Sequence, residues 1–344
     1  MPLAGRLDPT SFQGKVVGAS SAEPHARVDS VPVMPSGTSD WPGGAALLRR
    51  ALSRGYALAE RAVAGPPETV LDIAYRAIFQ RSPDRYARRD YLPALRRGEL
   101  TAETLGRRLI DSREFEALSA SRDLGLSLHR SRCAFVRSLP PARRILDLGG
   151  TDLGHEHGAM LTMGYPYRFD ELVIVDLAPD DRHEIYNRGG THSDVDTGRG
   201  TVRYAYHSMT DLSAYEDESF DLVYSGQSIE HVPVDAADVM LKSALRVLRP
   251  GGWLAVDTPN ARMTRLQQET LIDPDHTYEY RPDELRDKLV AAGFVVTEEK
   301  GLNLGRECLD AGRFDATELA RSVGVFADVE ACYLMAFVCR KLPG

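Results

Sequence analysis

The stretch RRILDLGGTDLG, residues 143–154, decides the fold of this chain. Its apolar residues Ile145, Leu146 and Leu148 predict a short buried strand, and Gly149 and Gly150 follow that strand directly. Glycines in such a turn let the backbone bend sharply and approach a ligand closely, which a side chain would prevent. The stretch therefore predicts a strand that leads into a ligand-binding turn. The turn alone does not identify the ligand, because NAD enzymes use a related one.

Short apolar runs alternate with helical stretches from Arg143 to the end of the chain. The runs that we expect to form strands are 145–148, 172–175, 202–206, 222–224, 253–257, 294–297 and 333–338. This alternation predicts an α/β fold with a doubly wound, mostly parallel, Rossmann-like sheet of seven strands. Ligands bind such sheets beyond the carboxyl ends of the strands, so we expect functional residues there.

Three later features narrow the choice of cofactor. The run ELVIVD ends in Asp176 at the tip of the second strand, where a carboxylate can accept hydrogen bonds from ribose hydroxyls. DESFDLVYSGQSIEHV, residues 217–232, covers the fourth strand. ALRVLRPGGWLAVDTPN, residues 244–260, contains a Pro-Gly-Gly turn between a helix and the fifth strand.

In this order, the motifs resemble those of the class I S-adenosylmethionine-dependent methyltransferases. That family's first motif usually reads hhDhGxGxG, its fourth strand reads FDhV before a Glu-His pair, and Pro-Gly-Gly precedes its fifth strand. The chain departs from the first motif, because Thr151 to Gly154 place no glycine at the usual third position. The resemblance implies an antiparallel last strand over CYLMAFVCR, S-adenosylmethionine as the cofactor, and an enzyme that transfers a methyl group.

The resemblance also implies which residues bind the cofactor. They are Asp147, Gly149, Gly150, Gly154, Asp176, Ser208, Met209 and Gln227. The glycines would line the methionine and ribose side, Asp147 would orient the loop or approach the amino group, and Asp176 would hold the ribose. Ser208 stands where the family often has an Asp near the adenine amine, and a hydroxyl accepts a hydrogen bond less strongly than a carboxylate. Met209 would stack on the adenine.

Candidates for the chemistry follow the fourth and fifth strands. Methyl transfer from a sulfonium is an in-line displacement that needs mainly positioning, but an acceptor hydroxyl also has to lose a proton. His231, in the Glu-His pair, is a candidate base, and the alternative is a residue of the pocket wall. Asn260, just past the fifth strand, is expected to face the acceptor.

DPDHTYEYRPDEL, residues 273–285, resembles a segment of bacterial methyltransferases, several of which are associated with glycan modification. The resemblance implies that His276 lies over the acceptor site as a catalytic or substrate-contacting residue. It also implies that Glu279 orients His276 and that Tyr280 contacts the substrate. The alternative is a loop that braces the helix beginning at Pro282.

No metal site is predicted. The residues Asp257, Asp273, Asp275 and His276 are close in sequence, and some sugar methyltransferases hold Mg²⁺ with carboxylates. Their spacing does not require an ion, however.

The chain divides into four parts. We expect a disordered tail over 1–42, a helical accessory module over 43–118, a linking helix over 119–142 and the methyltransferase domain over 143–344. Gly, Pro and Ser are frequent in the tail, and Pro140-Pro141 ends the linking helix.

From about residue 68, the module resembles the small helical DUF4214 family. The matching residues are Tyr75, Arg76, Arg81, Pro83, Asp84, Leu95, Gly98, Ser112, Glu114 and Phe115. The resemblance implies an all-α accessory domain of a kind often found on bacterial glycan-related or surface proteins. Arg outnumbers Asp and Glu between Arg76 and Arg113. That excess indicates either a solvated helical face or a docking patch for an acidic or glycan partner.

Composition excludes some classes of function. A net charge of −8 over 344 residues argues against nucleic acid as the main partner. The four cysteines have neither disulfide-scaffold nor metal-binding spacing, which favours a reducing compartment. No apolar run is long enough to span a membrane, so we expect a cytoplasmic protein. Composition says nothing about its oligomeric state.

Three functions are compatible with these features. The first is O-methylation of a sugar hydroxyl on a glycan, polysaccharide or glycosylated metabolite, which the module and the segment around His276 favour. The second is N- or O-methylation of a small natural product. The third is a binding protein with a methyltransferase fold and no chemistry, which the irregular first motif and Ser208 favour.

Overall fold

The computed structural model describes residues 65–152, 154–182 and 191–343. The predicted tail and residues 43–64 of the helical module lie outside the described residues. The described part begins with four helices: α2 (Pro67–Phe79), α3 (Arg85–Arg96), α4 (Ala102–Ile110) and α5 (Arg113–Ser138). It then continues into a single nine-stranded sheet with helices on both faces.

Helices α2, α3 and α4 share a small apolar core of their own. Leu71, Leu105 and Leu109 are almost completely buried in it. Thr101 begins α4 as a capping residue, because its hydroxyl accepts a hydrogen bond from the backbone N–H of Thr104. Gly98 follows the end of α3 with a positive φ of 71°, as expected for a glycine that ends a helix.

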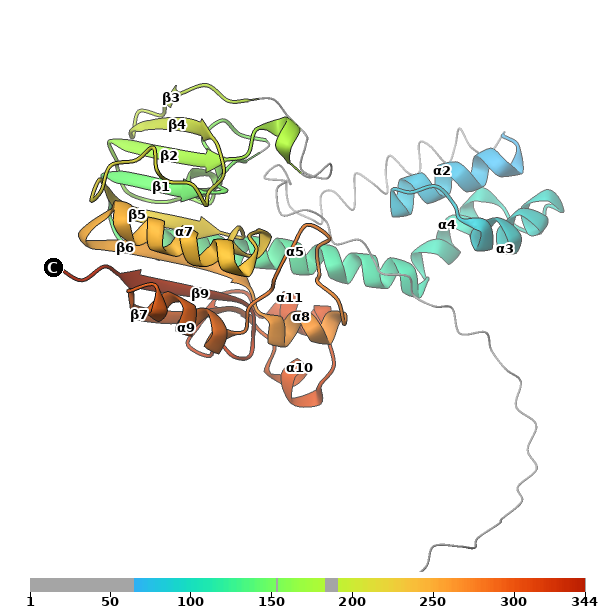
Figure 1. The fold of residues 1–344 in the computed structure, drawn as a ribbon. Coiled ribbons are helices and arrows are strands. Elements are labelled where there is room, and N and C mark those ends of the chain that lie inside the picture. The colour runs from blue at the N-terminus through green and yellow to red at the C-terminus, as the bar shows by residue number, and fades with distance from the viewer. Residues whose placement is uncertain (1–64, 153, 183–190, 344) are drawn as a thin grey trace, which may run out of the picture. The chain divides into compact units, whose positions relative to one another are not determined.

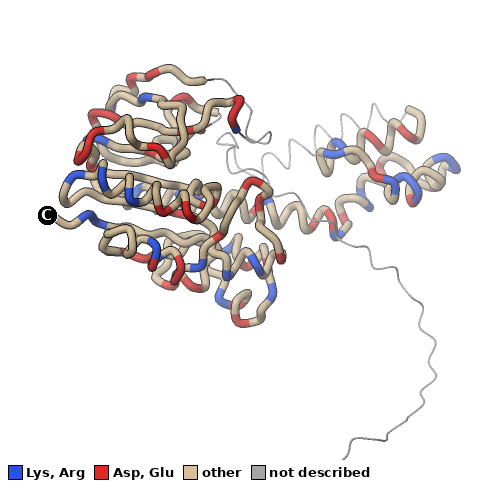
Figure 2. The backbone as a smooth tube through the Cα atoms, viewed as in Figure 1, with Lys and Arg blue, Asp and Glu red and all other residues tan. Residues whose placement is uncertain are grey.

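Several arginines of this module pair with acidic side chains, and Figure 2 shows basic and acidic positions interspersed along its backbone. Arg81 forms an ion pair of 2.7 Å with Glu114, and Arg96 pairs with Glu68. Arg107 pairs with Glu103 one helical turn earlier, at 2.7 Å. The excess of Arg in the sequence therefore does not produce a uniformly cationic surface on the described helices.

The sheet has nine strands, whereas seven were predicted. The strands are β1 (Arg144–Leu148), β2 (Glu171–Asp176), β3 (Val195–Asp196), β4 (Thr201–Tyr206), β5 (Phe220–Gly226), β6 (Leu248–Pro259), β7 (Val295–Leu304), β8 (Val325–Phe326) and β9 (Cys332–Arg340). Their spatial order is β3-β4-β2-β1-β5-β6-β9-β7-β8. The two additional strands, β3 and β8, have two residues each and lie at the two edges, so they are too short to show an alternating pattern in the sequence.

The central strands are parallel and the last strand is antiparallel, as predicted. β1 pairs in parallel with β2 on one side and with β5 on the other, and β5 pairs in parallel with β6. β9 lies between β6 and β7 and runs antiparallel to both. Because β4, β2, β1, β5 and β6 all point the same way, their carboxyl ends meet along one edge of the sheet (Figure 1).

Helices cover both faces of the sheet. One face packs against α5, α6 (Ala159–Thr162), α8 (Ala261–Gln267), α10 (Arg306–Ala311) and α11 (Ala316–Arg321). The other face packs against α7 (Val234–Val247) and α9 (Pro282–Ala291). Alternate strand residues supply the two cores: in β2, Leu172 and Ile174 belong to the first, and Val173 and Val175 to the second.

Helix α5 is longer than the linking helix predicted over 119–142. It begins at Arg113, because the hydroxyl of Ser112 caps it by accepting a hydrogen bond from the backbone N–H of Phe115, and it ends at Ser138 before Pro140-Pro141. The predicted module boundary at residue 118 therefore falls inside a continuous helix. Within the described part of the chain, no helix combines the length and the apolar character that crossing a membrane requires.

Candidate functional site

The turn after β1 is built so that only glycine fits. Gly149 has a φ of 78°, its N–H donates a 2.7 Å hydrogen bond to the carbonyl of Val175, and an added Cβ would lie 2.8 Å from the Cβ of Ser228. An added Cβ at Gly150 would overlap the carboxylate of Asp147. The turn therefore brings bare backbone to the carboxyl edge of the sheet, next to the segment that follows β5.

Asp147 is a buried carboxylate that lies against this turn. Its side-chain oxygens have no hydrogen-bond partner among the residues that the structure describes. Burial raises the pKa of Asp147 to about 8, with the positive charge of Arg132 acting against the rise and the negative charges of Asp176 and Asp257 adding to it. A buried carboxylate without partners is costly, and a ligand that brings a cation or hydrogen-bond donors would remove that cost.

The third glycine of the motif is displaced relative to the prediction. Gly154 is exposed, whereas Gly158 is buried with a φ of 76°, and an added Cβ there would overlap the side chain of Ile174. Between them, Asp152 accepts hydrogen bonds from the Gly154 N–H at 3.0 Å and the Thr162 hydroxyl at 2.9 Å. Gly158 therefore packs closely against the side chain of Ile174 in β2.

Predicted cofactor residues also lie at the end of β2 and just beyond the end of β4. Asp176 accepts a 2.7 Å hydrogen bond from the Leu177 N–H, and Arg182 lies 3.5 Å from the same carboxylate oxygen. Ser208 bonds to Thr210, with 2.8 Å between the two hydroxyls. The Cε of Met209 would lie 3.6 Å from a Cβ at Gly149, so the structure brings this apolar side chain to the glycine turn.

Gln227 follows β5 in a conformation that is unusual for a side-chain-bearing residue. Its φ is 56°, and its backbone N–H and side-chain amide both donate to Asp257, at 2.7 and 2.9 Å. Asp257 also accepts from Arg132 at 2.7 Å and from the hydroxyl of Tyr224 at 2.5 Å. These contacts lock the end of β5 against β6 and α5. They also leave Asp257 committed to a buried ion pair, which is inconsistent with the metal-ligand alternative considered for it.

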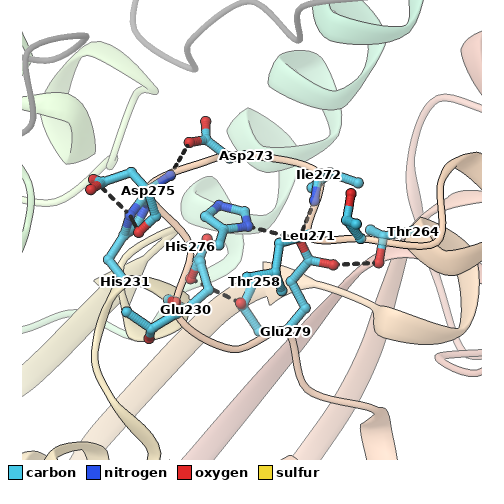
Figure 3. Close-up of polar contacts among 12 residues, drawn as sticks. Glu230, His231, Thr258, Thr264, Leu271, Ile272, Asp273, Asp275, His276 and Glu279 are labelled. Carbon is cyan, nitrogen blue, oxygen red and sulfur yellow. Dashed lines mark hydrogen bonds and ion pairs between the residues drawn. The ribbon is translucent and has the colours of Figure 1, made fainter. Parts of the chain in front are cut away.

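His276 and Glu279 form the pair that the sequence predicts (Figure 3). The Nδ1 of His276 lies 2.8 Å from Oε1 of Glu279, and Glu279 also accepts hydrogen bonds from Thr264 at 2.6 Å and from the Ile272 N–H at 2.8 Å. Burial alone would raise the pKa of Glu279, but the bonds from His276, Thr264 and Ile272 hold it below its usual value. Burial alone would lower the pKa of His276, but the bond to Glu279 and nearby carboxylates raise it.

His231 lies beside His276. Their rings meet edge to face, with centroids 4.8 Å apart and an angle of 83° between the planes. The Nδ1 of His231 lies 3.1 Å from a carboxylate oxygen of Asp275. Glu230, the preceding residue in the short 3-10 helix η2 (Ile229–His231), is completely buried and accepts a 2.9 Å bond from Thr258. Burial raises the pKa of Glu230, against the lowering effect of the two histidines.

The loop that carries His276 is fastened to η2 by its backbone. The N–H groups of Thr277 and Tyr278 donate to the carbonyl of Glu230, at 2.8 and 3.2 Å. Figure 3 shows the resulting group of histidine and carboxylate side chains drawn from η2 and from the loop between α8 and α9. The segment after β5 thus contacts both the glycine turn and the histidines, since Ser228 lies against Gly149 and Glu230 lies against the histidines.

Two predicted substrate residues have other roles in the structure. Asn260 is completely buried, and its side-chain amide donates to the carbonyls of Val329, Glu330 and Cys332 while its oxygen caps α8. It therefore ties strand ends together and does not face an acceptor. Tyr280 is 1% exposed and its ring packs in the core of the α7 and α9 face, while its hydroxyl has no hydrogen-bond partner among the described residues.

Sequence reasoning missed several residues of the site. Arg132 is buried in α5 and pairs with Asp257, and no feature of the sequence distinguishes it from the neighbouring arginines. Ser228 lies inside the quoted fourth-strand motif, but nothing in the sequence assigns it a role. Gly158 could have been considered as the displaced third glycine, since it follows the same strand.

Comparison with known proteins agrees with this geometry. Residues 152–256 match a family model described as a methyltransferase domain. The chain is 40% identical over 94 residues to a probable S-adenosylmethionine-dependent methyltransferase of Mycobacterium tuberculosis, covering 27% of this chain and 34% of that protein. It is 26% identical over 211 residues to a ubiquinone biosynthesis O-methyltransferase of Paraburkholderia phymatum, covering 58% of this chain and 78% of that protein. The chain spans about a third of the length of the mycobacterial relatives that it matches.

Solved structures include similar folds. One is an S-adenosylmethionine-dependent methyltransferase of Thermotoga maritima, described as a possible histamine N-methyltransferase, with 21% identity and a TM-score of 0.43 over 66% of this chain and 98% of that chain. Another comes from Listeria monocytogenes, with 14% identity and a TM-score of 0.42 over 63% of this chain and 99% of that chain. Residues 152–256 thus match a methyltransferase domain, and the curated relatives that the chain matches over part of their length are S-adenosylmethionine-dependent methyltransferases.

Proposed function

We propose that this chain transfers the methyl group of S-adenosylmethionine to an oxygen of its acceptor, and that the acceptor is a sugar hydroxyl. The observation that carries the proposal is the pairing of two features on one edge of the sheet. The glycine turn with the unpartnered Asp147 suits a cationic cofactor, and the histidine and carboxylate group beside it suits an acceptor that must lose a proton.

On the cofactor side, S-adenosylmethionine would lie over Gly149 and Gly150. Asp147 would accept a hydrogen bond from the amino group of the cofactor, and Asp176 would accept hydrogen bonds from the ribose hydroxyls. Met209 would cover the adenine, and Ser208 would bond to its exocyclic amine. Each of these side chains lies at or just beyond the carboxyl end of its strand, where ligands of such sheets bind.

On the acceptor side, His276 would act on the proton of the reacting hydroxyl. Glu279 fixes the ring of His276 through Nδ1, so the second ring nitrogen is the one that can reach a substrate. His231 lies next to it and would complete the wall of the acceptor pocket. Displacement at the sulfonium then needs only a correct distance and line of attack.

The helical module would bring the acceptor to the enzyme. Its resemblance to a family found on glycan-related proteins supports this role. Because many of its arginines are paired with acidic neighbours, a glycan with few charges is a better partner for it than a strongly acidic one.

An acceptor panel tests the proposal. The purified full chain is incubated with S-adenosylmethionine and with sugars, phenols, carboxylic acids or amines, and formation of S-adenosylhomocysteine is measured against a control without acceptor. We expect turnover with hydroxyl acceptors and the best turnover with a sugar. Turnover restricted to amines would contradict oxygen transfer, and turnover restricted to phenols would contradict the sugar.

A further inference from the structure

The side chains of Glu230, His231 and His276 converge on one point. Each offers one ligand atom, and these atoms lie within 4.8 Å of one another. We propose that these three residues bind a divalent first-row transition-metal ion, such as Zn²⁺, Mn²⁺ or Fe²⁺, on the acceptor side of the pocket.

Glu230 supplies the observation that points most directly to a ligand. It is completely buried, Thr258 occupies its Oε2, and its Oε1 has no hydrogen-bond partner among the described residues. An unmet buried carboxylate oxygen costs far more than an exposed one. A cation bound at Oε1 would supply the missing partner.

The two histidines are held in the way that metal-binding histidines usually are. Nδ1 of His276 faces Glu279 at 2.8 Å, and Nδ1 of His231 faces Asp275 at 3.1 Å. A carboxylate on one ring nitrogen fixes the tautomer and ring orientation and makes the other nitrogen, Nε2, a better ligand. Each histidine would therefore bind the ion through Nε2.

The geometry needs little adjustment to accept an ion. With bonds of about 2.1 Å to nitrogen and oxygen, neighbouring ligand atoms around a metal are about 3–3.5 Å apart. The three atoms here lie within 4.8 Å of one another, so binding an ion would draw them somewhat closer together. The backbone is already fixed, because Thr277 and Tyr278 bind the loop to the carbonyl of Glu230.

The donor set indicates which ions fit. Two imidazoles and one carboxylate suit transition metals, whereas Mg²⁺ and Ca²⁺ prefer oxygen ligands alone. Three protein ligands leave coordination positions open for a substrate oxygen. That role rests on the proposed function and gives the ion the task assigned there to the free Nε2 of His276: the ion would lower the pKa of an acceptor hydroxyl placed against it, and the proton would pass to water. The binding of the ion does not depend on the proposed function.

Metal binding by the full chain tests the inference without any acceptor. The protein is stripped with a chelator, dialysed against Zn²⁺ or Co²⁺ and analysed for bound metal by mass spectrometry, with Mg²⁺ as a comparison. We expect one equivalent of Zn²⁺ or Co²⁺ per chain and no retained Mg²⁺. The visible absorption of bound Co²⁺ should indicate nitrogen and oxygen ligands.

Variants of two proposed ligands, of one supporting residue and of one control residue complete the experiment. Glu230→Gln and His276→Asn should weaken Co²⁺ binding by at least tenfold, while His129→Ala, which removes an exposed histidine of α5, should not change it. Asp275→Asn, which disturbs only the support of His231, should weaken binding less. Thermal melts of each variant verify that it is folded.

The inference would be overturned if the wild-type protein held no Zn²⁺ or Co²⁺ after dialysis, or if Glu230→Gln still held a full equivalent. The two proposals fail separately. If the protein retains no Zn²⁺ or Co²⁺ but methylates a hydroxyl, the metal inference is wrong and the proposed function stands. If the metal binds but no hydroxyl acceptor is methylated, the proposed function is wrong and the metal site stands.

Discussion

Replacing Asp147 with Asn should stabilise the protein without its cofactor, and the gain should grow with pH. The carboxyl has a folded-state pKa of about 8 because it is buried, whereas the unfolded chain has an ordinary value near 3.8. Between these two values the unfolded state holds fewer protons, so the wild-type protein loses stability as the pH rises from about 4 to about 8. Asn is neutral at every pH and avoids this loss.

The shift sets the size of the expected effect. One pKa unit corresponds to about 1.4 kcal/mol, so ionisation of this buried group costs roughly 2 kcal/mol at pH 5 and roughly 6 kcal/mol at pH 9. The difference in free energy of unfolding between Asp147→Asn and wild type should therefore increase by about 4 kcal/mol between these pH values. Urea denaturation at pH 5 and pH 9, followed by circular dichroism, measures it.

A second buried carboxylate provides the control. Asp221 accepts hydrogen bonds from the backbone N–H groups of Arg143 and Arg144, at 2.7 and 2.9 Å, so Asp221→Asn should destabilise the protein at both pH values. In the same experiment Asp147→Asn should lose most of the stabilisation that S-adenosylmethionine gives to the wild type. If the difference in free energy of unfolding between Asp147→Asn and wild type is the same at pH 5 and pH 9, the reasoning is refuted.

Three further changes are informative. Gly150→Ala should abolish the thermal shift produced by S-adenosylmethionine, since its Cβ would overlap the carboxylate of Asp147; an unchanged shift would show that the turn can relax. Arg132→Met should lower the free energy of unfolding by about 3–5 kcal/mol in urea, because it leaves Asp257 buried without its cation, and the double variant with Asp257→Leu should recover much of that loss. His276→Asn should slow methyl transfer roughly 10²-fold or more while calorimetry finds nearly unchanged cofactor affinity; a loss below about threefold would reject its role.

The sequence predicts the fold well where the pattern is local and repeated. All seven predicted strands are present. The central ones β1, β2 and β5 are runs of mostly apolar residues that are buried on both faces of the sheet. The edge strands β3 and β8 were missed because two residues carry no periodicity. The start of α5 was placed too late, although Ser112 followed by an acidic first turn is a recognisable helix start.

The site was only partly predictable. The pairing of His276 with Glu279 is implied by the resemblance of residues 273–285 to a methyltransferase segment, and the structure has it. The burial of Asn260 and Tyr280 could not be read from the sequence, because it depends on strand β9 and on helices far away in the chain. The approach of Glu230 to His276 depends in the same way on how the loop after α8 folds back over η2.

The most direct test of the central claim is a calorimetric titration of the full chain with S-adenosylmethionine. We expect saturable binding of one molecule per chain and no binding of NAD. Asp176→Ala should bind at least tenfold more weakly, because it loses the hydrogen bonds from the ribose hydroxyls; a factor of ten corresponds to about 1.4 kcal/mol of binding free energy. An absence of heat at millimolar S-adenosylmethionine would contradict the claim, and so would equal affinities of wild type and Asp176→Ala.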